Sequence, residues 1–394
     1  MKKALIIILV VLILLLGAAW AYLLLNGTPE NLADVRTTLF GASDTNFPTG
    51  SEAGVATETP FEETPTDHIV PVSALLAQIT KRAVAGAMLT PLDTSTSVRY
   101  VEKGTGHVYS LDLSTGREGR LSGRTVPNVV SAYWAPNGQH VVLITDRDGI
   151  RGETLLGTLT ESDLETETLA PIDNIAFSRD SALLYFTEKT PSLGTRASVY
   201  NLETKTASVV FTVPFGEATV LWDIWDKEEH YVYTKPAQGF MGYLYKVAGG
   251  GLEKIDESLH LTVSRPDAQT VIINKNSNTG PYSLMLTLEN GLGLFLSNQT
   301  LSEKCGATEQ AVICAANAGM NNSAFPFAWY QGSVSYTDMI YRIDRTTGES
   351  TQMSDLEALS REQIDVSDLI VTNDGRAIFR NKRDDTLWLY NLPQ

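Results

Sequence analysis

One pattern constrains the fold of this chain more than any other: a strand, a tight polar turn and a strongly apolar second strand recur at wide intervals. The pattern is seen in SAYWAPNGQHVVLITD, IAFSRDSALLYFTE, LTVSRPDAQTVIIN and LIVTNDGRAIFRNK. The turns begin near Thr90, Ala135, Ser178, Asp226, Ser264, Ala307 and Thr372. Their spacings are about 45, 43, 48, 38, 43 and 65 residues, close to the period of roughly 40–50 residues of propeller blades.

The strand after each turn is dense in β-branched and aromatic residues, as in 141–143 and 183–186. A strand this apolar has to be buried on both faces. An apolar residue stands in register before five of the turns: Trp134, Phe177, Trp225, Val263 and Val371. A second hairpin of alternating strands follows in segments such as 107–122, 198–211 and 339–354. Two hairpins make one four-stranded sheet, so the repeat predicts an all-β, seven-bladed β-propeller over residues 71–394.

The two ends of this region complement each other. The last repeat, 369–394, carries three strands and no fourth, whereas the apolar segment 74–80 precedes the first repeat without a partner of its own. We expect strand 74–80 to supply the missing fourth strand and to close the ring, which would leave no inner edge exposed. The alternative is a loose N-terminal strand.

The N-terminus predicts the location of the protein. Residues 4–25 contain no charge, and their 22 residues would span about 33 Å as a helix, enough to cross a hydrocarbon core. Lys2 and Lys3 precede the segment, which places the N-terminus in the cytoplasm and the remainder outside by the positive-inside rule. We therefore expect residues 1–25 to be a transmembrane signal anchor in the cell membrane. The alternative is a signal peptide cleaved after the small-x-small sequence at 19–21.

Residues 26–70 form an acidic segment with eight Asp and Glu residues against one Arg. Within it, 41–67 is rich in Gly, Ser, Thr, Pro and Glu, a composition that predicts a disordered, flexible linker. The whole chain has a formal net charge of −16. A surface this acidic is repelled by phosphate backbones, which argues against a nucleic-acid partner.

The turns with sequence Ser-Arg-Pro-Asp and Thr-Asn-Asp-Gly, and the segments Asp-Leu-Ser-Thr-Gly and Ile-Asp-Arg-Thr-Thr-Gly, carry a family resemblance. They resemble the WD40-like repeats of TolB-type bacterial β-propellers over residues 75–394. VAGA at 84–87, VRYVEKGTGHVY at 98–109, the cysteine hairpin and WYQG at 329–332 are similar to membrane-anchored propeller proteins of candidate-phylum bacteria. That group has no assigned activity, so the resemblance implies architecture and location rather than function.

Cys305 and Cys314 flank a hairpin centred on Glu309 and Gln310. This register places the two cysteines opposite each other, within disulfide range, and the expected compartment is oxidising. We predict a structural disulfide, worth about 2–3 kcal/mol by the loop-entropy argument. A pair of buried free thiols is the alternative. A metal or redox role is disfavoured because no His or third Cys accompanies the pair.

The long sixth repeat contains the candidate binding loop. Its excess length falls near 317–336, and insertions in blades emerge as loops that commonly bind partners. The candidate binding residues are Phe325, Phe327, Trp329, Tyr330, Gln331 and Tyr336. Exposed, they would offer aromatic area to a peptide or a sugar. The alternative is that the aromatic rings fold down to plug the channel or to pad the next blade.

We predict no catalytic, cofactor-binding or metal-binding residues. The five histidines lack metal-site spacing, and the chain has no G-x-S-x-G elbow and no phosphate loop. The expected function is a non-enzymatic scaffold at the cell envelope that binds a protein or peptide. Carbohydrate or cell-wall binding through 317–336 is the first alternative, and a hydrolase with residues lining the channel is the second.

Overall fold

The computed structural model describes residues 70–393 apart from 91–96, 162, 226–228, 249–250, 278–279, 289–290 and 318–325. Within these ranges the chain forms seven antiparallel four-stranded sheets, each of which is one blade. Blade 1 contains β2 (Val84–Thr90), β3 (Ser97–Glu102), β4 (Val108–Asp112) and β5 (Glu118–Arg120); blade 2 contains β6 (Val129–Trp134), β7 (His140–Arg147), β8 (Ile150–Leu159) and β9 (Leu164–Leu169); blade 3 contains β10 (Asp173–Phe177), β11 (Leu183–Lys189), β12 (Thr195–Asn201) and β13 (Thr206–Val213). Blade 4 contains β14 (Ala218–Leu221), β15 (Tyr231–Thr234), β16 (Met241–Ala248) and β17 (Gly251–Leu259); blade 5 contains β18 (Thr262–Ser264), β19 (Thr270–Ser277), β20 (Gly280–Thr287) and β21 (Leu292–Phe295); blade 6 contains β22 (Cys305–Ala307), β23 (Ala311–Ala316), β24 (Met339–Asp344) and β25 (Ser350–Asp355); blade 7 contains β26 (Val366–Val371), β27 (Arg376–Asn381), β28 (Leu387–Asn391) and β1 (Leu76–Gln78).

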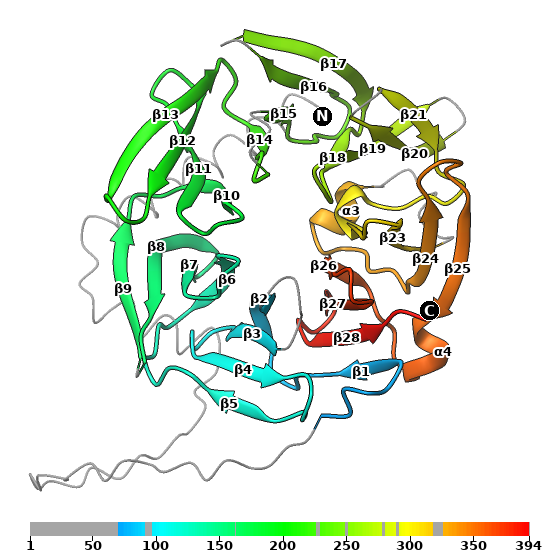
Figure 1. Cartoon of the computed structure of the whole chain (residues 1–394). Coiled ribbons are helices and arrows are strands. Elements are labelled where there is room, and N and C mark those ends of the chain that lie inside the picture. Colours follow the sequence, from blue (N-terminus) through cyan, green and yellow to red (C-terminus); the bar gives the residue numbers. More distant parts are fainter. Residues whose placement is uncertain are drawn as a thin grey trace, which may run out of the picture. The chain divides into compact units, whose positions relative to one another are not determined.

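The blades stand side by side around a ring, with the first strand of each blade nearest the centre (Figure 1). Because all neighbouring strands in a blade are antiparallel, the connections alternate between two faces of the ring. We call the face where each first strand begins the upper face. It carries the connections from second to third strands and from one blade to the next. The opposite, lower face carries the other two hairpin turns of each blade. The seven-bladed all-β propeller expected from the repeat is confirmed.

The core lies between blades. Val141, Val142 and Leu143 of β7 are fully buried, as the apolar pattern of the second strands predicts. One buried cluster joins Tyr100 of blade 1 to Leu389 of blade 7, and another joins Ile272 of blade 5 to Val312 of blade 6. Each blade therefore covers the apolar face of the next, which is why the second strands are apolar on both sides.

All seven turns singled out in the sequence lie between the first and second strands of their blades. The prediction that Trp225 stands in register at the end of a first strand is wrong. The first strand of blade 4 ends at Leu221, and Trp225 lies in the connection that follows, where the guanidinium of Arg265 stands 4.9 Å from its ring centroid. Apolar residues continue beyond Leu221 with Trp222, Ile224 and Trp225, so the pattern alone does not mark where this strand ends.

The blade that closes the ring combines both ends of the described chain. β1 pairs antiparallel with β28, with Leu76 opposite Tyr390 and Gln78 opposite Trp388. The Thr80 hydroxyl also accepts a hydrogen bond from the backbone N–H of Leu387 at 3.0 Å. Segment 74–80, which the sequence left without a partner, thus contributes the outermost strand of blade 7.

Cys305 and Cys314 form the predicted disulfide, and they stand opposite each other in the β22–β23 hairpin with Cα atoms 4.1 Å apart. Both half-cystines are buried between blades 5 and 6. The bridge therefore joins the first two strands of the blade that carries the insertion.

The predicted membrane anchor at 1–25 and most of the predicted linker at 26–70 lie outside the described residues. Among the helices that are described, none has the length and apolar character needed to span a membrane. Residue 70 is the first described residue. Its backbone N–H donates to the carbonyl of Gly116, in a lower-face turn of blade 1, at 3.1 Å. The chain therefore joins the ring at its lower face.

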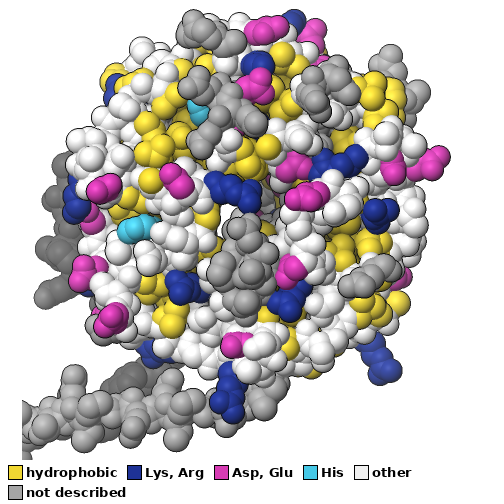
Figure 2. Space-filling view, in the orientation of Figure 1, with side chains coloured by type: hydrophobic (Ala, Val, Ile, Leu, Met, Phe, Trp, Pro, Cys, Tyr) yellow, Lys and Arg dark blue, Asp and Glu magenta, His cyan; other side chains and the backbone are white. Residues whose placement is uncertain are grey.

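Charged side chains do not segregate on the surface. Figure 2 shows acidic and basic side chains interspersed with hydrophobic ones over the face in view. On this face neither acidic nor basic side chains gather in one patch.

Candidate functional site

Three connections of the upper face meet beside blade 6. The first contains η1 (Ser302–Lys304) and leads from β21 to β22; the second is the insertion between β23 and β24, which contains α3 (Phe327–Tyr330). The third contains α4 (Leu356–Ser360) and leads from β25 to β26. η1 contacts the first strands of blades 5 and 7, so it lies close to the centre of the ring. Figure 1 shows α3 on the inner side of the ring near β18 and β23.

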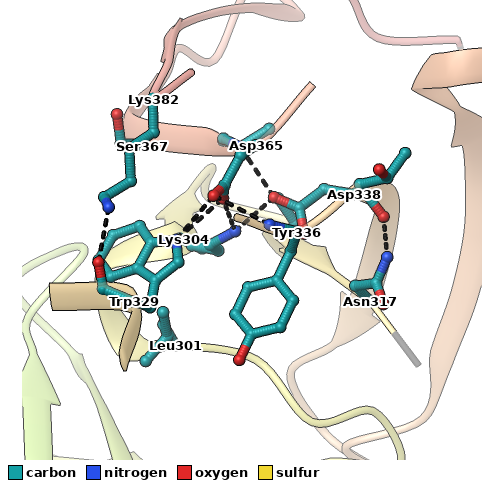
Figure 3. Close-up of polar contacts among 12 residues, drawn as sticks. Leu301, Lys304, Asn317, Trp329, Tyr336, Asp338, Asp365, Ser367 and Lys382 are labelled. Atoms are coloured by element: carbon teal, nitrogen blue, oxygen red, sulfur yellow. Dashed lines mark hydrogen bonds and ion pairs between the residues drawn. The ribbon is translucent and has the colours of Figure 1, made fainter. Parts of the chain in front are cut away.

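A buried ionic cluster joins these three connections. The Lys304 ammonium donates to Asp338 Oδ2 at 2.5 Å and to Asp365 Oδ1 at 2.6 Å (Figure 3). All three side chains have no exposed surface. Asp338 Oδ2 also accepts from the backbone N–H of Val366 at 2.8 Å, which ties the end of the insertion to the first strand of blade 7.

The aromatic residues of the insertion enclose this cluster. The Trp329 indole N–H donates to both carboxylate oxygens of Asp365, at 2.9 and 3.0 Å, and the backbone N–H of Tyr336 donates to the same carboxylate at 3.0 Å. The Lys304 ammonium lies 5.3 Å from the Trp329 ring centroid and 5.4 Å from that of Tyr336. The Lys382 ammonium covers Trp329 at 4.5 Å and donates to its carbonyl at 2.6 Å. Figure 3 shows these side chains turned toward one another.

The electrostatics of the cluster indicate a structural role. Desolvation raises the pKa of Asp338, and the Lys304 charge opposes this shift. Desolvation also lowers the pKa of Lys382. Because the ions have no exposed surface and all their oxygens except Asp338 Oδ1 accept hydrogen bonds within the protein, no substrate could reach them. The cluster holds the insertion onto the ring.

Glu303 lies next to Lys304 in the chain but belongs to a different environment. Its Oε1 accepts a hydrogen bond from the Tyr330 hydroxyl, and its Oε2 accepts from the Ser302 hydroxyl at 3.1 Å. Burial raises the pKa of Glu303, and burial followed by the Glu303 charge raises the pKa of Tyr330. Even so, Glu303 keeps part of its surface accessible and Tyr330 keeps 41%. Glu303 and Tyr330 are therefore accessible from solvent, unlike the sealed ionic cluster beside them.

The structure separates the six candidate binding residues. Phe325 lies outside the described residues. Trp329 and Tyr336 are both 5% exposed and pack with Leu301 in one apolar cluster, so these two rings offer little surface to a partner. Phe327 is half-buried, with its ring 4.8 Å from that of His260, whereas Tyr330 and Gln331 are exposed. The surface of α3 available to a partner thus centres on Tyr330 and Gln331.

Four charged residues of this region escaped the sequence interpretation: Glu303, Lys304, Asp338 and Asp365. Lys304 lies 34 residues from Asp338 and 61 from Asp365 along the chain. Individually each looks like an ordinary surface charge in a chain rich in acids. The signal that could have found these four residues is the topology, since all four lie on connections that a propeller brings to the same face.

Other sites for small ligands are scarce in the part of the chain that the structure describes. No group of three or more His, Cys, Asp or Glu side chains there could hold a metal ion. A cavity between blades 3 and 4, lined by residues such as Asn174, Thr187 and Lys235, has a volume of about 10 Å³. That volume admits one water molecule.

No model of a known protein family matches the chain, and no curated protein sequence matches it. Among solved structures, it is similar to oligogalacturonate lyase from Vibrio parahaemolyticus, at 11% identity and a TM-score of 0.55, over 81% of this chain and 94% of that one. It is also similar to the β-propeller domain of the trilobed protease from Pyrococcus furiosus, at 10% identity and a TM-score of 0.51, over 75% of this chain and 92% of that domain. TolB from Acinetobacter baumannii matches at 13% identity over 65% of this chain and 62% of that one, with a TM-score of 0.42.

These identities establish the shared fold and nothing about activity. The Pyrococcus domain is described as having an open velcro topology, whereas the present ring is closed by β1 in the sheet of β28. The chain is a seven-bladed β-propeller whose solved structural neighbours include a lyase, the β-propeller domain of a protease and TolB.

Proposed function

We propose that the protein is a non-enzymatic scaffold that binds a protein or peptide partner at the cell envelope through the upper face of the ring. In this proposal residues 4–25 anchor it in the cell membrane, with the N-terminus in the cytoplasm and the propeller outside. The observation that carries the proposal is the construction of the insertion. Its interior is fixed by the buried cluster of Lys304, Asp338 and Asp365, while Tyr330 and Gln331 face outward.

A loop fixed in this way is suited to binding. Ordering a flexible loop on association costs free energy, and an insertion already held by buried ion pairs avoids most of that cost. Tyrosine combines apolar area with a polar tip and is enriched in the binding surfaces of proteins. The first described residue, Val70, contacts a turn of the lower face, opposite the face that carries Tyr330.

Carbohydrate binding is the second candidate, and the pairing of the Tyr330 ring with the Glu303 carboxylate favours it. Sugars bind proteins by stacking on aromatic rings and by hydrogen bonds to carboxylates. Burial of Trp329 and Tyr336 leaves less stacking area than the sequence suggested, so the protein or peptide ligand is preferred. A channel-located hydrolase ranks third, because among Glu303, Asp338 and Asp365 only Glu303 is accessible.

Site-specific photo-crosslinking tests the scaffold proposal. A photoreactive phenylalanine analogue replaces Tyr330 in the full chain, which is expressed in the cells in which the protein naturally occurs. The matched control replaces Phe295, which is 70% exposed on the outer strand of blade 5. We expect a defined crosslinked protein from position 330 and none from position 295. Equal crosslinking at both positions, or none at 330, would count against the proposal. Glycan arrays with wild type and Tyr330→Ala test the carbohydrate alternative, since Trp329→Ala would disturb the core as well.

A further inference from the structure

Glu303 is a partly accessible carboxylate without a cationic partner. Among the residues that the structure describes, no Lys, Arg or His nitrogen lies within 4.0 Å of its oxygens. The adjacent Lys304 ammonium is hydrogen-bonded to Asp338 and Asp365, and its charge opposes the raised pKa of Glu303 without forming a direct ion pair with it. The two hydroxyls that donate to Glu303, those of Tyr330 and Ser302, are neutral. The negative charge of Glu303 is therefore only partly offset within the protein.

We propose that Glu303 and Tyr330 form a subsite for an organic cation, the ammonium or guanidinium group of a peptide partner. The inference rests on the proposed function and names the chemistry of its ligand. A carboxylate accepts about four hydrogen bonds, and Glu303 uses two of them within the protein, so acceptor capacity remains for a ligand. The neighbouring Tyr330 ring adds the aromatic surface that favours a bound cation.

An organic cation suits the pair of Glu303 and Tyr330 better than a metal ion does. Divalent ions in proteins take several oxygen ligands, and no cluster of three acidic or His side chains occurs in the described part of the chain. An ammonium or guanidinium group needs one carboxylate and gains from a nearby aromatic face. The aromatic ring at the carboxylate is that of Tyr330, whose hydroxyl donates to Glu303.

Burial of the carboxylate supports the same conclusion. Desolvation raises the pKa of Glu303, so holding its charge costs free energy in the unliganded protein. A bound cation would compensate that charge, and it would compete with protonation of Glu303. Binding should therefore weaken as the pH falls through the raised pKa of Glu303. Functional charges that lower the stability of the free protein are a common feature of binding sites.

The test uses small probes and the full chain in detergent micelles. Binding of butylammonium, butylguanidinium and uncharged butanol is measured by ligand-detected NMR, for wild type, E303Q and the control E309Q. Glu309 is an exposed acid in the lower-face turn of the same blade. We expect the cations to bind wild type and E309Q at least about tenfold more tightly than E303Q, the size of one charge-assisted hydrogen bond. The two cations show whether lysine-like or arginine-like groups are preferred.

Cations that bind no better than butanol, or that bind E303Q as well as wild type, would overturn the subsite. Folding of E303Q is checked by its thermal midpoint at pH 7, which we expect to equal or exceed that of wild type because an uncompensated charge is removed. A lower midpoint would indicate that Glu303 stabilises the ring as an ion, which contradicts the proposal. Cation binding that is lost in E303Q supports the subsite even if Tyr330 crosslinks to no protein, a result that would count against the scaffold alone.

Discussion

At the scale of single residues, three lower-face turns repeat one hydrogen-bond pattern. In blade 1, Asp112 Oδ1 accepts from the backbone N–H groups of the residues two and three positions on, and Asp344 in blade 6 and Asn201 in blade 3 do the same. Such Asx turns fix the backbone locally. Their side chains explain why the segments Asp-Leu-Ser-Thr-Gly and Ile-Asp-Arg-Thr-Thr-Gly look alike in the sequence.

The last position of this turn has a positive φ. Glycine, which adopts this conformation easily, stands there in blades 1 and 6, but lysine stands there in blade 3. Gly116 and Gly348 have φ of 71° and 75°, whereas Lys205 occupies the same place with φ of 54°. A left-handed conformation costs a residue with a side chain about 1–2 kcal/mol. Replacing that residue by glycine removes this cost, but part of the gain is cancelled because glycine loses more conformational entropy on folding. We expect Lys205→Gly to raise the free energy of unfolding by about 0.5 kcal/mol, measured by urea denaturation. Lys205→Ala is the control and should bring no gain; a gain of equal size would point to the lost charge instead.

The same turns predict a dependence on pH. The Thr347 backbone N–H, with further hydrogen bonds from Thr346, lowers the pKa of Asp344 from 3.8 to about 2. Above 3.8 the side chain is ionised in both states, and its stabilising effect is complete. As the pH falls toward 2 the unfolded chain takes up the proton first, so that stabilisation is lost.

Asp344→Asn tests this dependence, because Asn201 makes the same turn without titrating. We expect the variant to be about as stable as wild type at pH 7 and to unfold at a lower pH in an acid titration followed by tryptophan fluorescence. Superimposable acid titrations of the two proteins would show that Asp344 does not couple folding to protons.

At the scale of elements, the ionic cluster of Lys304, Asp338 and Asp365 joins three connections of blade 6 to one another. A lone buried carboxylate is far more costly than a paired one, so removing Lys304 should leave two such charges. We expect Lys304→Met to lower the free energy of unfolding by about 3–5 kcal/mol and to change the fluorescence of Trp329, which contacts the cluster. Lys254→Met is the control. Lys254 pairs with Glu257 at the exposed edge of blade 4, and its loss should leave the free energy of unfolding nearly unchanged.

The elements also show where sequence interpretation succeeds and where it ends. Cys305 and Cys314 could be paired because a hairpin register depends on nearby residues alone. The exposure of Trp329 could not be predicted, because it depends on Asp365, which lies 36 residues away on the connection from β25 to β26. An aromatic residue in a long loop suits a binding surface and a buried anchor equally well until its distant partner is known. Glu303 was missed for the same reason, since its partner Tyr330 lies 27 residues further along the chain, within the insertion.

At the scale of the whole molecule, recurrence was enough to predict the ring. Any single turn is ambiguous, as Trp225 illustrates, yet seven turns at a similar period admit few architectures. The repeat does not predict function. It shows the features that all blades share, whereas binding depends on features that occur in one blade alone. The unusual length of the sixth repeat was the only sequence feature of this second kind, and the candidate site lies there.

Closure of the ring offers the last prediction. β1 is short, but Ala77 and Ile79 are buried against blades 7 and 1, and the pairing covers the outer edge of β28. Deleting residues 74–80 removes that burial and leaves the backbone groups of β28 unpaired, an edge that favours association with a second chain. We expect a loss of at least about 3 kcal/mol in the free energy of unfolding, since truncating one such buried aliphatic residue costs about 2–5 kcal/mol. Calorimetry and light scattering should record a lower thermal midpoint together with oligomers. Leu75→Ala, at a side chain that is 40% exposed beside the same strand, is the control and should leave both unchanged. A deletion variant that melts with wild type as a monomer would mean that the six remaining blades and the three strands of blade 7 hold the ring without its closing strand.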